Sequence, residues 1–258
     1  MTDGPDLSLP LGAPASRRAR ADGRRIAEPS VIQRVKSTLL LPVGTVASVF
    51  DVPDAIALTF DDGPDPEVTP AVLDVLAHHD AKATFFVLSD QALAQPGLIG
   101  RMLDEGHEIG LHFDRHDRIP DLAPGEAWRR MRAARRALGQ MAGRISLFRP
   151  PYGSQTYLTY LFARVVGLQV IGWSQVANEW VPQTAEASAQ SASEHLKGGD
   201  IVLLHDGLAL GPGQPQPTLD RSRVADLVLQ EAGRRRLQSV RVSALLARGA
   251  PRRSHWFR

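Results

Sequence analysis

Cysteine is absent from this chain of 258 residues. Its absence excludes disulfides and thiolate metal sites, so a bound metal would have to be held by histidine or carboxylate side chains. The lack of cysteine does not identify the compartment in which the protein works.

Long apolar runs are also missing. The fairly apolar stretch from Ser37 to Phe50 has only 14 residues and is interrupted by Pro42 and Gly44, which is too short for a membrane span. A strand over residues 45–50 explains it better, and we expect no transmembrane segment. The first 30 residues lack the apolar segment of a secretion signal, which predicts a cytoplasmic location. The oligomeric state is left open.

The middle of the chain lacks the excess of positive charge that nucleic-acid binding would favour. The pI of about 9.3 comes from the ends, since residues 233–258 contain eight arginines and no acidic residue, and residues 1–36 contain seven basic and four acidic side chains. Residues 37–232 are acidic overall. No predicted strand is followed by a glycine-rich phosphate loop. We therefore expect solvated basic ends and no nucleic-acid partner.

The bulk composition, 43% hydrophobic and 22% charged, fits one large α/β domain. Residues 1–36 contain too few large apolar side chains to offset the entropy lost on ordering, which predicts a disordered basic N-terminal tail. We place the folded domain at residues 37–250 and a basic C-terminal tail at residues 251–258.

After Ala55 the pattern alternates between short β-favouring runs and helical segments. The predicted strands are Ile56–Phe60, Ala83–Leu88, Glu108–His112, Ile145–Phe148, Gln169–Trp173, Asp200–Leu204 and Gln238–Val242. The predicted helices are Val68–His79 with Thr69 as N-cap, Gln91–Glu105, Pro124–Met141, Thr156–Val166, Ala185–Leu196, Asp220–Arg235 and Ala244–Arg248. Such alternation predicts a parallel sheet with helical crossovers. The sheet could close into a barrel or remain open and doubly wound.

Two adjacent acids, Asp61 and Asp62, end the first strand of this alternation and precede Gly63 and Pro64. Successive strand residues point in opposite directions, so the two carboxylates can serve different purposes. In isolation the segment is better explained as a turn, because Asp and Gly are common turn residues.

Other reactive side chains also follow predicted strands. His112, His116, Arg149, Tyr152 and His205 all lie at or after a strand's carboxyl end, which is the edge where α/β folds place their active sites. We therefore expect these side chains to meet.

Two histidines and one carboxylate form a common hydrolytic metal site. The spacing of four residues between His112 and His116 suits such a site, although this spacing alone is weak. The same type of triad could hold iron in an oxygenase.

An acid–base pair beside a metal would favour hydrolysis. Asp61 can take a proton from water and His205 can give one to a leaving amine. Arg149 could keep Asp61 ionised, and Pro150-Pro151 could aim the Tyr152 amide at an oxyanion. Taken singly, His205 could be an ordinary histidine at a strand end and Arg149 part of a surface ion pair. Tyr152, after Pro150-Pro151, could belong to a rigid surface turn.

Together these residues resemble the polysaccharide deacetylase family, the NodB-homology group of carbohydrate esterases (carbohydrate esterase family 4). Its five motifs occur in order over about residues 44–247. They are Thr59-Phe60-Asp61-Asp62-Gly63-Pro64, the segment from His112 to His116, Arg149-Pro150-Pro151-Tyr152-Gly153, the segment from Trp173 to Trp180, and Leu203-Leu204-His205-Asp206. The resemblance implies a distorted (β/α)7 barrel.

The resemblance also implies a role for each matching residue. Asp62, His112 and His116 would bind a divalent metal, usually Zn²⁺ and sometimes Co²⁺ or Ni²⁺. Asp61 would be the base that activates water on the metal, and Arg149 would orient it.

On the opposite side His205 would be the acid that protonates the amine. The Tyr152 amide would donate to the oxyanion, and Trp180 and Leu203 would line the pocket for the acetyl methyl group.

Two residues depart from the family pattern. Phe113 stands where the second motif usually has Ser or Thr to brace the loop, so that brace is lost or replaced. Glu179 stands where the fourth motif usually has Asp to tune the catalytic histidine. Glu179 is one methylene longer and could still reach His205.

The expected function is therefore metal-dependent removal of an N-acetyl group from an N-acetylated sugar or polysaccharide. An alternative is hydrolysis of another acyl substrate, such as an O-acetyl xylan, a formamido sugar or a small cyclic amide. A more remote alternative is a non-catalytic carbohydrate-binding barrel.

Overall fold

The computed structural model describes residues 43–207 and 218–255. The N-terminal tail expected at residues 1–36 lies outside this range. Among the described residues, no helix combines the length and the apolar character needed to cross a membrane.

The centre of the molecule is a parallel sheet. Over the described residues its strands run in the order β6-β5-β4-β3-β2-β8-β7, and β9 pairs with β2 beside this path. Their bounds are β2 Ala55–Asp61, β3 Ala83–Val87, β4 Glu108–Leu111, β5 Leu147–Phe148, β6 Gln169–Val170, β7 Gln175–Val176, β8 Ile201–His205 and β9 Gln238–Ser239.

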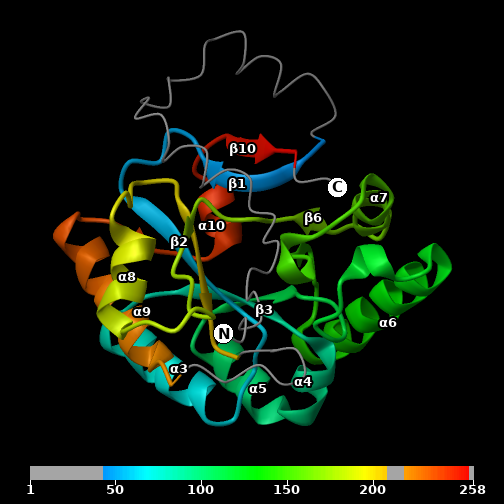
Figure 1. Cartoon of the computed structure of the whole chain (residues 1–258), viewed down its shortest axis with the longest axis horizontal. Coiled ribbons are helices and arrows are strands. Elements are labelled where there is room, and N and C mark those ends of the chain that lie inside the picture. Colours follow the sequence, from blue (N-terminus) through cyan, green and yellow to red (C-terminus); the bar gives the residue numbers. More distant parts are fainter. Residues whose placement is uncertain (1–42, 208–217, 256–258) are drawn as a thin grey trace, which may run out of the picture.

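Helices surround this sheet, and Figure 1 shows them in an arc outside the strands, apart from the last helix, α10 (Val242–Leu246), which packs on the inside. The helices are α3 Val68–His78, α4 Ser89–Ala94, α5 Pro96–Asp104, α6 Pro124–Ala142, α7 Tyr157–Val165, α8 Ala185–Ser193, α9 Arg221–Arg234 and α10 Val242–Leu246, with short 3₁₀ turns η1 Ile119–Asp121 and η2 Pro151–Gly153. This arrangement confirms the expected distorted (β/α)7 barrel and not the alternative, an open doubly wound sheet. Within the described residues no ladder joins β6 to β7, so the barrel wall is incomplete.

Strand alternation divides the core into two clusters. In β2, Ile56, Leu58 and Phe60 belong to the cluster shared with the outer helices. Ala57 instead packs on the inside with residues of α10 and of β1 (Thr45–Val49). Because side chains alternate along a strand, Asp61 has the same parity as Ala57 and points to the inside of the curled sheet.

A small antiparallel sheet crosses one end of the barrel. Strand β1 (Thr45–Val49) pairs with β10 (Pro251–Ser254), and Val46 of β1 also bridges to Ile171, directly after β6. The strand expected near residues 45–50 is therefore present. Residues 251–254 are not part of a tail but a strand, because the extended backbone there is paired with β1 along its length.

Several element boundaries differ from expectation. The helix expected at Gln91–Glu105 is divided into α4 and α5, because Pro96 has no amide hydrogen to continue the first helix. Thr69 is not the N-cap of α3, which begins at Val68 with Asp65 accepting hydrogen bonds from the Glu67 and Val68 amides. Strand β7 was not expected, since it has only two residues.

Candidate active site

The carboxyl ends of neighbouring strands bring the predicted acid and base together. Strands β2 and β8 are parallel partners, and their register places Asp61 directly opposite His205. Asp61 is 3% exposed and His205 is 8% exposed. Two reactive side chains that are 144 positions apart therefore lie side by side at one edge of the sheet.

Asp62 leaves the strand in a left-handed conformation, with φ of 76°. This turn brings its carboxylate to the two histidines that follow β4. The Oδ1 atom of Asp62 lies 3.3 Å from Nε2 of His112 and 3.3 Å from Nε2 of His116. One possible ligand atom from each of these three residues lies within 4.8 Å of the others.

The orientation of His112 fits a metal ligand. Its Nδ1 lies 2.8 Å from the carbonyl oxygen of Arg149. A carbonyl can only accept, so Nδ1 is the donor, and Nε2, on the side facing Asp62, is the atom that would ligate a metal. Carboxylate and imidazole donors of this kind suit zinc and related divalent ions.

The charges of the cluster also fit a cation. Burial lowers the pKa of His116 to about 4, so its imidazole is neutral at neutral pH and can act as a ligand. For Asp62, burial alone would raise the pKa, but His116 and His112 outweigh it and hold the pKa well below its usual range. The residues thus offer one carboxylate and two imidazole donors.

Arg149 holds Asp61 in place from inside the barrel. Its guanidinium is fully buried, and Nη1 donates to Asp61 Oδ1 at 2.7 Å and to Thr59 Oγ1 at 2.8 Å. The Nη2 atom donates to the Gly172 carbonyl at 2.8 Å. The guanidinium also stacks over Phe86 at 4.2 Å from the ring centre. A charge-assisted hydrogen bond of this kind fixes the orientation of the Asp61 carboxylate.

On the other side of the site, His205 is paired with Glu179. The His205 Nδ1 atom lies 2.8 Å from Oε2 of Glu179, which is fully buried. Burial alone would lower the pKa of His205, but the hydrogen bond and charge of Glu179 raise the pKa to about 9. The imidazole therefore carries a proton at neutral pH.

The remaining predicted residues also lie around this centre. Tyr152 has a left-handed backbone with φ of 59° in η2, and its ring lies 4.2 Å from that of His116. Trp180 meets the His205 ring edge-on at 5.5 Å. Leu203 is buried on β8, two residues before His205 and therefore on the same face of the strand.

Sequence reasoning missed two supporting side chains. Thr59 accepts from Arg149 and donates to the Val202 carbonyl at 2.6 Å. Thr69 donates to Oδ2 of buried Asp206 at 2.7 Å. Thr59 and Asp206 lie within the matched motifs, but contacts over 90 and 137 positions leave no local signal in the sequence.

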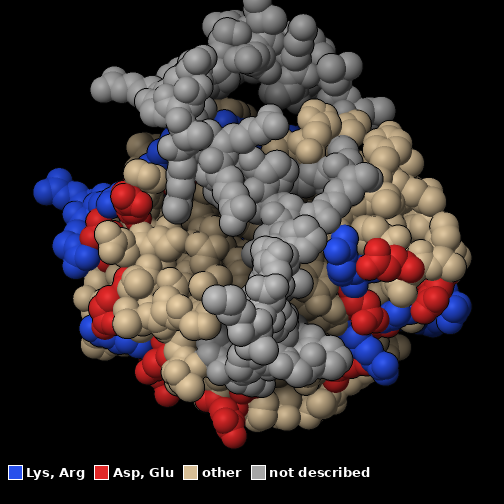
Figure 2. All heavy atoms as spheres, in the orientation of Figure 1, with Lys and Arg blue, Asp and Glu red and all other residues tan. Residues whose placement is uncertain are grey.

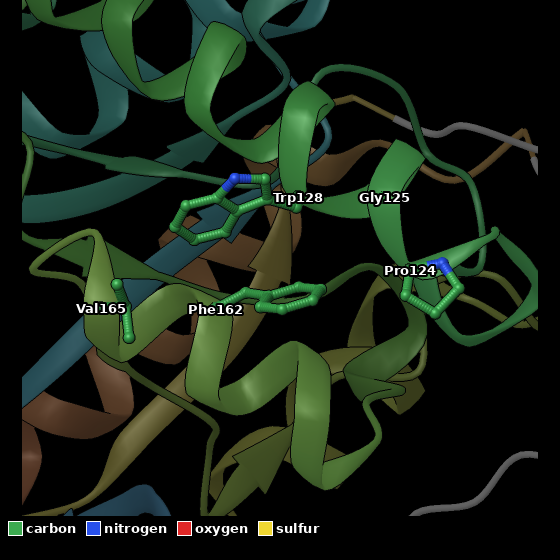
Figure 3. A pocket seen from close by; sticks show the side chains of 5 residues that line it. All are labelled: Pro124, Gly125, Trp128, Phe162 and Val165. Carbon is green, nitrogen blue, oxygen red and sulfur yellow. The ribbon is translucent and has the colours of Figure 1, made fainter.

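An apolar surface pocket lies elsewhere, between α6 and α7. Figure 3 shows its lining by Pro124, Gly125, Trp128, Phe162 and Val165. None of these five residues belongs to the candidate active site, and none of them has an ionisable side chain.

Comparisons with known proteins agree with this geometry. A family model described as polysaccharide deacetylase matches residues 51–171. The sequence is 33% identical to the peptidoglycan-N-acetylglucosamine deacetylase PgdA of Listeria monocytogenes over 78% of this chain, although the match spans only 43% of that relative. It is also 33% identical to the chitooligosaccharide deacetylase of Azorhizobium caulinodans, over 64% of this chain and 80% of that protein.

The fold agrees with a solved structure as well. The peptidoglycan deacetylase PdaC from Bacillus subtilis superposes with a TM-score of 0.66 at 28% identity, covering 76% of this chain and 91% of that chain. With its motifs, its fold and these relatives, the chain belongs to the polysaccharide deacetylase family.

Proposed function

We propose that this chain is a metal-dependent hydrolase that removes the acetyl group from an N-acetylated sugar. The observation that carries the proposal is a candidate metal cluster, Asp62, His112 and His116, with Asp61 on one side and protonated His205 on the other. The named activities of the relatives, deacetylation of peptidoglycan N-acetylglucosamine and of chitooligosaccharide, support the same substrate class.

Asp62, His112 and His116 would hold the divalent ion, which we propose to be Zn²⁺, with Co²⁺ or Ni²⁺ as alternatives. When bound, such an ion supplies Lewis acidity that polarises a carbonyl and lowers the pKa of water.

The chain's own residues account for the proton transfers. Asp61, oriented by Arg149, takes a proton from the water that attacks the amide carbon. The main-chain amide of Tyr152 donates to the oxyanion that develops on the carbonyl oxygen. His205, kept protonated by Glu179, gives its proton to the departing nitrogen. The C–N bond breaks, a C–O bond forms, and acetate and the free amino sugar leave.

Specificity for the acetyl group would come from apolar contacts. Leu203 and Trp180 flank His205, and we propose that they enclose the methyl group. A larger acyl group would then be excluded by size, whereas a formyl group would leave part of the space unfilled.

Acetate release from chitooligosaccharide and from peptidoglycan, with and without a chelator, tests the function. We expect activity that is lost on chelation and restored by zinc.

Asp61→Asn should keep the metal and lose at least ~100-fold in kcat, the usual scale for a general base. Near-normal turnover would contradict the role of Asp61. Faster release from acetylated xylan, a formamido sugar or a cyclic amide would instead assign another acyl substrate.

A further inference from the structure

The segment from His112 to Asp117 carries two of the candidate metal ligands and has an unusual residue between them. Phe113 is fully buried and has φ of 81°, in the left-handed region. A phenyl ring has no hydrogen-bonding group, so Phe113 cannot brace the segment as a hydroxyl side chain could. Something else must hold this backbone in place.

Helix α4 supplies part of the support through main-chain groups. The amide of Ser89 donates to the Phe113 carbonyl at 3.0 Å, and the amide of Asp90 donates to the Asp114 carbonyl at 3.2 Å. These bonds fix the first half of the segment. They do not involve the half that leads into His116.

Arg130 of α6 supports the segment from its other side. Its Nε and Nη2 atoms donate to the two carboxylate oxygens of Asp114, both at 2.8 Å, and Nη2 also donates to Asp117 at 2.5 Å. The guanidinium carbon lies 5.0 Å from the centre of the Phe113 ring, within the range of a cation–π contact. One side chain therefore contacts the residue after His112 and residues on both sides of His116.

An exposed ion pair would contribute little to such an arrangement. Figure 2 shows acidic and basic side chains mixed over the region that α6 occupies in Figure 1. Such mixing is typical of exposed ion pairs. The Arg130 side chain, however, is only 17% exposed. It makes a two-pronged bond to one carboxylate, the geometry in which arginine positions a partner most firmly.

We propose that Arg130 is a positioning residue for the metal site, holding His112 and His116 at the spacing that a divalent ion requires. It replaces the hydroxyl brace that Phe113 cannot supply. The inference rests on the metal site of the proposed function, but not on the identity of the substrate.

Zinc affinity of the full chain, measured by competition with a chromophoric chelator, tests this role without any substrate. Residues that orient metal ligands typically contribute ~10–100-fold to affinity, and we expect Arg130→Met to weaken zinc binding by that factor. Arg129→Met is the matched control, because Arg129 is an exposed arginine on the same helix, and it should bind zinc as the wild type does. A folded Arg130→Met protein with an affinity within twofold of wild type would overturn the proposal.

A second variant keeps the test decisive if Arg130→Met does not fold. Asp114→Asn preserves size but removes the carboxylate that the guanidinium grips, and it should weaken zinc binding in the same direction. In the double variant the two losses should be less than additive, because both remove one interaction. Unchanged zinc affinity in Asp114→Asn would count against the brace.

The same measurements separate this inference from the proposed function. A wild-type chain that binds zinc but releases no acetate would overturn the function and leave the role of Arg130 standing. Normal acetate release by the wild type, together with unchanged zinc affinity in both variants, would support the proposed function and overturn the role of Arg130.

Discussion

At the scale of single residues, the proposed base and the proposed acid are each held by a fully buried partner. Arg149 donates a hydrogen bond of 2.7 Å to Asp61, and Glu179, 2.8 Å from Nδ1 of His205, keeps that imidazole protonated. Environments that separate a base from an acid in this way are typical of hydrolytic active sites. The longer side chain of Glu179 reaches His205, so this departure from the family pattern preserves the contact.

Glu179→Gln should change the pH dependence of the reaction. His205 must be protonated to act as an acid, so activity should fall as pH rises through its pKa of about 9. Loss of the Glu179 charge should lower this pKa toward the ordinary histidine value near 6.5, moving the alkaline limb of kcat/KM to lower pH. A pH–rate profile checks this, with NMR titration of the imidazole as the direct measure. An unmoved alkaline limb would remove Glu179 from this role.

At the scale of elements, the turns after β2 and β8 are packed against each other without space for another atom. A Cβ on Gly207 would lie 2.8 Å from the carbonyl carbon and oxygen of Asp62, which are backbone atoms and cannot move aside alone. The position of the Asp62 carboxylate therefore depends on a glycine in the neighbouring turn.

Gly207→Ala should consequently destabilise the protein by ~1–3 kcal/mol, the usual range for overpacking, and weaken zinc retention. Gly233→Ala is the matched control, because no neighbouring atom lies within 4 Å of its added Cβ. In helix α9 that change should stabilise by up to ~1 kcal/mol. Chemical denaturation and zinc titration of both variants give the comparison. Equal behaviour of the two would contradict the tight packing at Asp62.

The elements also show where sequence reasoning succeeds and where it stops. Strands such as β2 and β8 were predicted because their apolar runs are long and end in polar turns. The two-residue strand β7 gives no such signal, because two half-buried edge residues, Gln175 and Val176, are too few to show a periodic pattern. The site residues could be found from motifs at strand ends, but Arg130 could not. In the sequence, Arg130 is one of several arginines on α6 that indicate a solvated helix face. Only the fold brings its side chain to Asp114.

At the scale of the whole molecule, the chain's two described ends are joined. Strand β10 pairs with β1, and Arg253 donates to the Gly44 carbonyl at 3.0 Å. Strand β1 in turn contributes Val46 and Val49 to the inner core. The sequence predicts a basic tail at residues 251–258 because the arginines there suggest solvent exposure. It gives no sign that the backbone of β10 is paired with β1.

A chain ending at Ala250 should therefore melt at a lower temperature than the full chain, by about 5 °C, if the lost pairing contributes ~1–2 kcal/mol. A chain ending at His255 retains all of β10 and serves as the control. Calorimetry of the three proteins provides the measurement. Identical melting temperatures for the chains ending at Ala250 and His255 would show that the β1–β10 pair adds no stability.

The register between β2 and β8 has a consequence for how this fold can change over time. Asp61 and His205 are held opposite each other by main-chain hydrogen bonds, which do not depend on side-chain identity. Loops that follow the strands can accept insertions and new sequences without moving either group, whereas a one-residue slip of β8 would turn His205 toward the outer helices. Changes in substrate specificity should therefore arise mainly in the loops. The pairing of β2 with β8 should be the part of the fold that evolution alters least.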